Sequence, residues 1–333
     1  MRRLLAYCMI ASCCAGFQAN ADDGKYLKVC DTWGEGYFVL PGSETCLKIS
    51  GSLTFDLSVG EDVYSSEPLG RVVPASSASI DFSTASETDL GALRSVLSID
   101  LDEASDEGGG VTLSEAVLEL NGLLVGATSS QFDLWLNSAG AVLSDDVIAY
   151  GPSFTNLISY TTSFDELWSA MVGVEQGETR DDFDFLVHGG VPHAVAGIRL
   201  GAERIQIGSV MGYDSVREHV AAKVRLDLEI TDSFSTFAMV GYRSGHNEPG
   251  YFGTWEGRFA AWAGFSLDLS EELVLNSQAA YTDTGKYAIA ASFDYVLLPS
   301  LLISTELAFT SLPTDEGVRD SAIGGLLSIE REF

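Results

Sequence analysis

The chain has 333 residues, of which 46% are hydrophobic, and it carries a formal net charge of −30 because acidic residues far outnumber basic ones. This charge argues against partners such as nucleic acid or anionic lipid headgroups, and it suits a solvated surface that attracts cations. Adaptation to a salty or acidic habitat explains the overall charge equally well. No stretch beyond the N-terminus approaches the roughly 20 apolar residues that a membrane-spanning helix needs.

Residues 1–21 are predicted to be a secretory signal peptide. A positively charged start precedes an apolar stretch over residues 4–17, and Ala19-Asn20-Ala21 fits a signal-peptidase site, so the mature chain is expected to begin at Asp22. A lipoprotein is the alternative, because Ile10-Ala11-Ser12-Cys13 resembles a lipobox. Cleavage there would leave a very short signal, which favours the first interpretation.

Two cysteines, Cys30 and Cys46, remain after cleavage. An even pair in an oxidising compartment predicts a disulfide, and a loop of about 15 residues gives it a stabilising effect of roughly 3 kcal/mol. Two cysteines without an adjacent histidine cannot complete a zinc shell, so no metal is expected. Residues 22–45 are therefore predicted to be an N-terminal segment that bears the disulfide.

From residue 46 to the C-terminus, apolar and polar residues alternate in segments of about ten residues. In residues 220–230, for example, valine, leucine and isoleucine share one face, while Lys223, Arg225 and Asp227 share the other. A period of two indicates strands, and ten residues suffice for a tilted strand to cross a bilayer. Sixteen strands are predicted, over residues 46–59, 79–87, 91–101, 112–121, 123–130, 154–164, 167–175, 185–197, 204–213, 219–231, 234–243, 257–269, 273–283, 286–298, 301–311 and 319–333.

The links between these segments alternate in length. Tight turns are expected at residues 165–166, 232–233, 271–272 and 299–300, and longer, acidic links at 60–78, 102–110, 176–188, 244–257 and 313–320. Short links at one end and long links at the other are typical of an outer-membrane barrel, and an even number of strands allows an antiparallel barrel to close. Sixteen strands leave an aqueous channel. The chain also ends inside an alternating strand, on Phe333, as such a barrel does.

The segment from Val29 to Lys48 resembles the N-terminal signature of the alphaproteobacterial porins of the Rhizobiales and Brucella type. It carries Cys-Asp, Gly-x-Gly-Tyr and Pro-Gly-x-x-Thr-Cys-Leu in that order. Residues 81–95 resemble the second hairpin of that family, and residues 120–126 and 131–133 resemble the approach to its pore loop. The resemblance extends over essentially the whole mature chain.

This resemblance implies an all-β fold, a 16-stranded antiparallel transmembrane β-barrel over residues 46–333. It implies a location in the Gram-negative outer membrane among its lipids, a homotrimer, and passive passage of small hydrophilic solutes and ions without a cofactor. The barrel-assembly machinery is expected to recognise the chain through Phe333.

The resemblance also implies that the third extracellular loop, residues 131–153, folds into the lumen and narrows it. This loop carries Asp133, Asp145 and Asp146, and charges at a constriction select ions by sign. Lys48 and Arg94 have the phase of the lumen face and are the candidate basic residues of the pore wall. Because basic residues are few, a preference for cations is predicted. The alternatives are a solvated loop tip without a role in selectivity, and structural pairing of the two basic residues with lumen acids.

Catalysis is not expected. Of the four histidines, the closest pair is His188 and His193, and their spacing matches no known triad or metal motif. A structural or adhesive barrel, plugged by residues 131–153, remains the alternative to an open channel.

Overall fold

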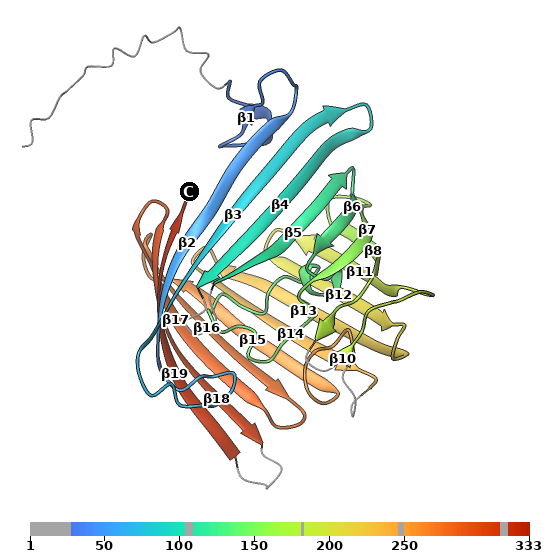
Figure 1. Ribbon diagram of the computed structural model, residues 1–333. Coiled ribbons are helices and arrows are strands. Elements are labelled where there is room, and N and C mark those ends of the chain that lie inside the picture. The colour runs from blue at the N-terminus through green and yellow to red at the C-terminus, as the bar shows by residue number, and fades with distance from the viewer. Residues whose placement is uncertain (1–27, 104–108, 181–182, 246–249, 314–318) are drawn as a thin grey trace, which may run out of the picture.

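The computed structural model describes residues 28–103, 109–180, 183–245, 250–313 and 319–333. Residues 1–21, the predicted signal peptide, lie outside the described residues. The described chain forms a closed, all-β barrel of 16 antiparallel strands, which confirms the predicted fold class (Figure 1). Within the described residues, no helix is long and apolar enough to span a membrane.

Each strand of the wall pairs with its neighbour in the sequence, and the last strand pairs with the first. Strand β19 lies beside β2 in the register Leu327↔Leu57, and β8 lies beside β11 in the register Glu175↔His193. The wall consists of β2 (Cys46–Gly60), β3 (Val73–Thr88), β4 (Gly91–Glu103), β5 (Gly110–Leu120), β6 (Leu123–Thr128), β7 (Thr155–Ser163), β8 (Trp168–Glu175), β11 (His193–Ala202), β12 (Ile205–Asp214), β13 (His219–Thr231), β14 (Phe234–Arg243), β15 (Phe259–Asp268), β16 (Leu273–Thr282), β17 (Tyr287–Leu298), β18 (Leu301–Pro313) and β19 (Arg319–Glu332).

Short connections gather at one end of the barrel, which we term the turn end, and long ones at the other, the loop end. The turn between β5 and β6 shows why the sequence folds this way: Asn121 and Gly122 have φ of 48° and 86°. Two successive positive φ angles belong to the tight hairpin turn that matches the twist of the strands, and Asn-Gly is its preferred sequence. The N-terminal strand β1 (Phe38–Val39) and the C-terminus both lie at the turn end (Figure 1).

The N-terminal segment, residues 28–45, is tied to the turn end of β2. A disulfide joins Cys30 to Cys46, with the two Cα atoms 6.1 Å apart, which confirms the predicted pairing. Strand β1 (Phe38–Val39) pairs with β2, and the short 3₁₀ helix η1 (Asp31–Trp33) precedes it. The small hairpin of β9 (Thr179–Arg180) and β10 (Phe183–Asp184) projects at the loop end.

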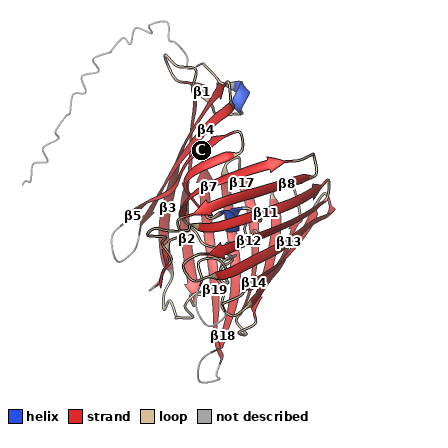
Figure 2. Cartoon of the chain, turned by 90° about the vertical axis from the view of Figure 1, so that its right-hand side faces the viewer, coloured by secondary structure: helices blue, strands red, loops and turns tan. Residues whose placement is uncertain are grey.

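Alternation along the strands divides the wall into two faces. On β13, Val224 and Ile230 face outward with 46% and 54% of their surface exposed, while Lys223 faces inward and is 1% exposed. The buried core therefore lies inside the barrel, where the loop between β6 and β7 enters with the helix α1 (Gln131–Leu134), seen in blue within the ring of strands in Figure 2.

Of the sixteen predicted strands, one was misplaced. The strand predicted over residues 185–197 begins instead at His193 and continues to Ala202. Residues 185–192 form a loop, because two successive glycines, Gly189 and Gly190, adopt positive φ of 146° and 110°, and Pro192 lacks the N–H that a central strand donates.

Candidate functional site

Residues 129–154, termed the inner loop, leave the wall at β6 and turn into the barrel. The Ser130 hydroxyl caps α1 by accepting the N–H of Phe132 at 3.1 Å. The carboxylate of Glu175 on β8 accepts the Ser130 hydroxyl at 2.8 Å and the Gln131 N–H at 2.9 Å. Tyr251 donates its hydroxyl to the same carboxylate at 2.7 Å. Because these partners are buried, they fix the direction in which the loop enters.

Basic side chains of the wall bind the carbonyl groups of the inner loop. Arg199 on β11 donates to the carbonyl of Trp135, and its guanidinium lies 4.6 Å from the centre of that indole ring. Arg225 on β13 donates to the carbonyl of Ser138 and pairs with Asp227 at 2.8 Å. The loop therefore lies over these positive charges.

Lys223 on β13 is the most buried of these basic residues. Its ammonium group donates to the carbonyl of Tyr150 at 2.7 Å and lies 3.6 Å from Asp133 Oδ1. The same nitrogen lies 4.8 Å from the centre of the Phe132 ring. A buried ammonium group requires such partners, so this contact fastens both halves of the loop to one wall position.

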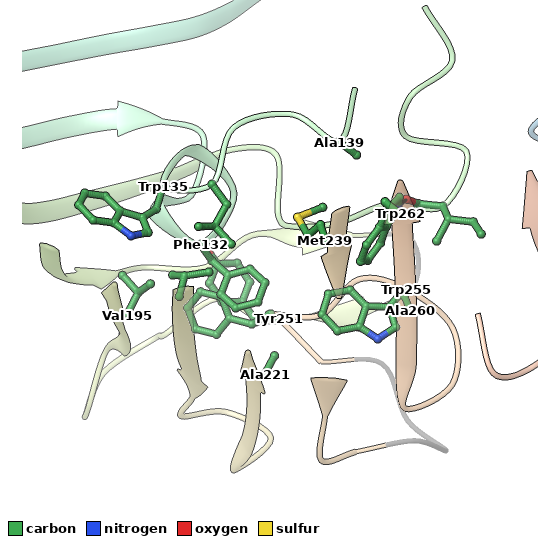
Figure 3. Close-up of a cluster of buried hydrophobic side chains, with 14 of the residues drawn as sticks. Phe132, Trp135, Ala139, Val195, Ala221, Met239, Tyr251, Trp255, Ala260 and Trp262 are labelled. Carbon is green, nitrogen blue, oxygen red and sulfur yellow. Dashed lines mark hydrogen bonds between the residues drawn. The ribbon is translucent and has the colours of Figure 1, made fainter. Parts of the chain in front are cut away.

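A cluster of aromatic and aliphatic side chains fills the interior between the inner loop and strands β8–β16 (Figure 3). The rings of Phe132 and Phe252 lie 5.1 Å apart, and those of Trp255 and Trp262 lie 5.6 Å apart. The main ring-bearing members come from the inner loop, from the segment between β10 and β11, from residues 250–258 and from the wall: Phe132, Trp135, Phe185, Tyr251, Phe252, Trp255 and Trp262. This sector of the barrel is thus packed with side chains.

Inward-facing glycines make room for these rings. A Cβ atom built at Gly197 would lie 2.5 Å from Trp135 Cδ1, and one at Gly212 would lie 2.5 Å from Phe252 Cδ2. At Gly208, a Cβ atom would lie 2.5 Å from Leu136 Cδ2. Glycine in a strand lacks a side chain to pack, and here that absence forms the sockets of the loops.

The second half of the inner loop continues along the wall as far as β18. Trp262 on β15 donates its indole N–H to the carbonyl of Ile148 at 2.9 Å, and Gln278 on β16 donates to the carbonyl of Asp145 at 2.6 Å. Glu306 on β18 accepts the N–H of Ser144 at 3.0 Å. The contacts of the loop thus run from β8 round to β18, and strands β2–β5 stand opposite.

The three predicted loop acids lie in different surroundings. Asp133 lies beside Lys223, yet burial raises its pKa. Burial also raises the pKa of Asp145 to about 6, partly opposed by the hydroxyl of Tyr150, which donates to it at 2.8 Å. Asp146 accepts the hydroxyl of Tyr64, from the loop between β2 and β3, at 2.7 Å. The structure therefore separates Asp133, tied to the wall, from Asp145 and Asp146 at the tip.

The two predicted basic residues of the pore wall lie at the turn end, against the N-terminal segment. The Lys48 side chain passes Gly36, where an added Cβ atom would lie 3.4 Å from it, and the Arg94 guanidinium lies 5.6 Å from the centre of the Trp33 ring. The basic residues that contact the inner loop are instead Arg199, Lys223 and Arg225. The alternation did place Lys223 and Arg225 on the polar face, but nothing in the sequence paired them with the loop.

The inward face of β2–β5 is acidic. Several acidic side chains of these strands point into the barrel. The strand register shows this, because each acid is paired with an inward-facing residue of the next strand or lies two residues from one on its own strand. They include Asp56, Asp81, Asp100, Asp102, Glu115 and Glu119. Lys48 and Arg94 lie on the same face at the turn end, and most of the remaining inward residues are serine, threonine, alanine or valine.

The two neighbouring histidines do not form a catalytic site. His193 is fully buried, contacts the carbonyl of Phe185 through Nε2 at 2.8 Å, and accepts the N–H of Ser215 through Nδ1 at 3.1 Å. His188 is exposed and pairs with Asp184 at 2.9 Å. Among the described residues, no group of three or more histidine, cysteine or acidic side chains is arranged to hold a metal ion.

Comparison with protein families finds one model, described as the porin subfamily, that matches residues 17–323. Among curated proteins, porin Omp2b of Brucella suis is 33% identical, with 93% of this chain and 91% of the relative covered. Porin Omp2a of Brucella melitensis is 34% identical, with the same coverage.

Comparison with solved structures finds the same architecture. The outer membrane channel DcaP of Acinetobacter baumannii superposes with a TM-score of 0.69 at 16% identity, covering 89% of this chain and 99% of that one. OmpF of Salmonella typhi, solved as a complex with daunomycin, gives a TM-score of 0.62 at 12% identity, covering 87% and 98%. At these identities the similarity concerns the fold.

Proposed function

The chain belongs to the porin subfamily, whose members are outer-membrane channels and not enzymes, and we propose that it passes small hydrophilic solutes and ions passively with a preference for cations. Its location is the outer membrane of a Gram-negative cell.

One observation supports the cation preference above the others: the basic residues that contact the inner loop and the acids of β2–β5 lie in different sectors of the barrel. The basic residues of β11 and β13 lie under the inner loop and are bound to its carbonyl groups. The acids of β2–β5 face the sector that the loop leaves uncovered. A wall of one charge sign raises the local concentration of ions of the opposite sign.

Single-channel recording in a planar bilayer under a KCl gradient tests this proposal. Stepwise openings with a cation-selective reversal potential are expected. The double variant Asp145→Asn/Asp146→Asn should lower the cation-to-anion permeability ratio if the loop tip contributes to selection, and Asp184→Asn, on the exposed β9–β10 hairpin, serves as the control for loss of a carboxylate away from the loop tip. Anion selectivity of the native protein would refute the cation preference. A folded barrel without conductance would favour the plugged structural barrel, for which the filled β8–β16 sector is the specific argument.

The homotrimer predicted from the family resemblance has support in the lengths of the strands. A strand needs about 9–11 residues, tilted, to cross the hydrocarbon core. Strand β6 has 6 residues and β8 has 8, so this part of the wall is too short to face lipid over its full height. A second copy of the chain would cover it. Crosslinking in native outer membranes, compared between the native protein and an Ile158→Arg variant on the outer face of β7, tests this arrangement.

The C-terminal residue is proposed to direct insertion through the barrel-assembly machinery. Phe333 is 59% exposed, and its backbone exchanges two hydrogen bonds with Gly51 on β2, at 3.1 and 3.0 Å. Its ring is therefore accessible at the turn end, next to the seam that closes the barrel. Deletion of Phe333 should lower the amount of assembled protein in cells while leaving refolding into detergent intact.

A further inference from the structure

The tip of the inner loop meets the wall at a single carboxylate. Glu306 faces inward on β18 and is 6% exposed. Its carboxylate accepts the backbone N–H of Leu143, the backbone N–H of Ser144 at 3.0 Å and the hydroxyl of Ser144. Successive N–H groups in a turn form a concave anion-binding site. In this protein the anion belongs to the chain itself and comes from a strand more than 160 positions further along.

The surroundings of this contact are apolar. Val142 and Val147 of the loop pack against Ala288, Ala290 and Ala308 on β17 and β18. Alanine side chains leave space for the loop tip but offer its N–H groups no acceptor. The Leu143 and Ser144 N–H groups are partly shielded from water here, so their bonds to Glu306 stabilise the loop tip in this position.

The two acids at the tip follow this contact directly in the sequence. Gln278 holds the carbonyl of Asp145, and Tyr64 holds the carboxylate of Asp146, each through one hydrogen bond. Hydrogen bonds to an ionised acceptor are stronger than those between neutral groups, and Glu306 receives three. The position of the loop tip across the channel, and with it that of both acids, therefore depends most on Glu306.

We propose that Glu306 is the positioning residue of the constriction: a tethered anion that occupies the anion-binding turn at Leu143 and Ser144, and so sets the width of the channel and its cation preference. This inference rests on the channel function proposed above. Removal of the carboxylate should do more than remove one negative charge, because it releases the loop tip and leaves an empty anion site in the constriction.

The test compares Glu306→Gln with Glu330→Gln in planar-bilayer recordings. Glu330 faces the interior on the neighbouring strand β19, so both variants lose one inward carboxylate, and only the first loses the contact with the loop. We expect Glu306→Gln to increase the current noise of the open channel and to lower the K⁺/Cl⁻ permeability ratio at least twofold below that of Glu330→Gln. Equal conductance, noise and permeability ratio in the two variants would overturn the inference.

Chemical rescue separates an anion site from a general loss of structure. Sodium acetate added to Glu306→Ala should restore the quiet open state of the native channel, because acetate replaces the missing carboxylate, while the same addition to the native protein should change nothing. A lack of rescue would count against the tethered-anion role.

If Glu306 variants do not refold, Ser144→Ala decides the question, since it removes one donor and keeps both N–H groups. Ser144→Ala should raise the current noise and lower the K⁺/Cl⁻ permeability ratio, as expected for Glu306→Gln, but by a smaller amount. A channel identical to the native one would refute the inference. Absence of conductance in the native protein would instead refute the channel function.

Discussion

Replacement of Lys223 with methionine tests whether the wall holds the inner loop through buried charge. Methionine keeps an apolar stem but loses the bond to the Tyr150 carbonyl at 2.7 Å and the ion pair with Asp133 at 3.6 Å. A hydrogen bond from a charged donor contributes about 1.5–3 kcal/mol. The Asp133 side chain is 22% exposed, so solvent screens the ion pair and its loss adds about 1 kcal/mol. Relief of ammonium burial offsets part of this, and we expect the free energy of unfolding to fall by about 2–4 kcal/mol.

The Asp133→Asn variant and the double variant complete a thermodynamic cycle. Once the aspartate is neutral, Lys223→Met leaves no buried charge without a partner, so the two losses should fall short of additivity by about 1–2 kcal/mol. Urea unfolding of the refolded barrel in lipid vesicles, followed by tryptophan fluorescence, measures each corner of the cycle. Strict additivity would show that Lys223 and Asp133 do not stabilise one another, and the account of the loop anchor would then be wrong.

Three further predictions follow from the same contacts. Because the pKa of Asp145 is raised to about 6, acidification from pH 8 to pH 5 protonates its carboxylate and should lower the cation-to-anion permeability ratio about twofold. In Asp145→Asn this pH response should disappear. A response of unchanged size would show that another group is responsible. Replacement of Cys30 and Cys46 with serine removes a crosslink that stabilises by about 3 kcal/mol, but only over the N-terminal segment, so proteolysis of residues 28–45 should accelerate while the unfolding midpoint of the barrel stays unchanged. Gly212→Val should expose residues 250–258 to protease because its side chain occupies the position of the Phe252 ring, whereas Gly201→Val, with no neighbour within 4 Å, should not.

The strands and their order could be predicted from the sequence because each strand of a closed barrel separates two different environments. Alternation along residues 219–231 distinguishes the outward Val224 from the inward Lys223, and Asn121-Gly122 marks a tight turn. The prediction failed at residues 185–192, where apolar residues at the loop end belong to a core and not to a strand. Phe185, for example, is fully buried among Tyr251 and His193.

The partners of the constriction could not be predicted from the sequence. Lys48, Arg94, Lys223 and Arg225 share the same inward phase, so alternation alone does not distinguish those that meet the inner loop. The height of each residue along the tilted wall decides this, since Lys48 and Arg94 lie close to the turn end and Lys223 lies deeper in the barrel. The inward glycines were the available signal: a glycine at an inward position of a strand marks a place where another segment approaches closely.

The position of the inner loop explains how charge is arranged in the barrel interior of a chain whose net charge is −30. The inner loop presents carbonyl groups to the wall that it covers, and carbonyl groups require donors, so arginine and lysine lie beneath it on β11 and β13. Acids in that position would leave buried acceptors facing acceptors, which is unfavourable. The acids of β2–β5 remain on the uncovered face, where water solvates them, whereas Glu175 and Glu306, which contact the loop, accept its N–H groups. The demands of folding thus place basic residues beneath the inner loop, and the proposed cation preference would follow from the side on which the loop lies.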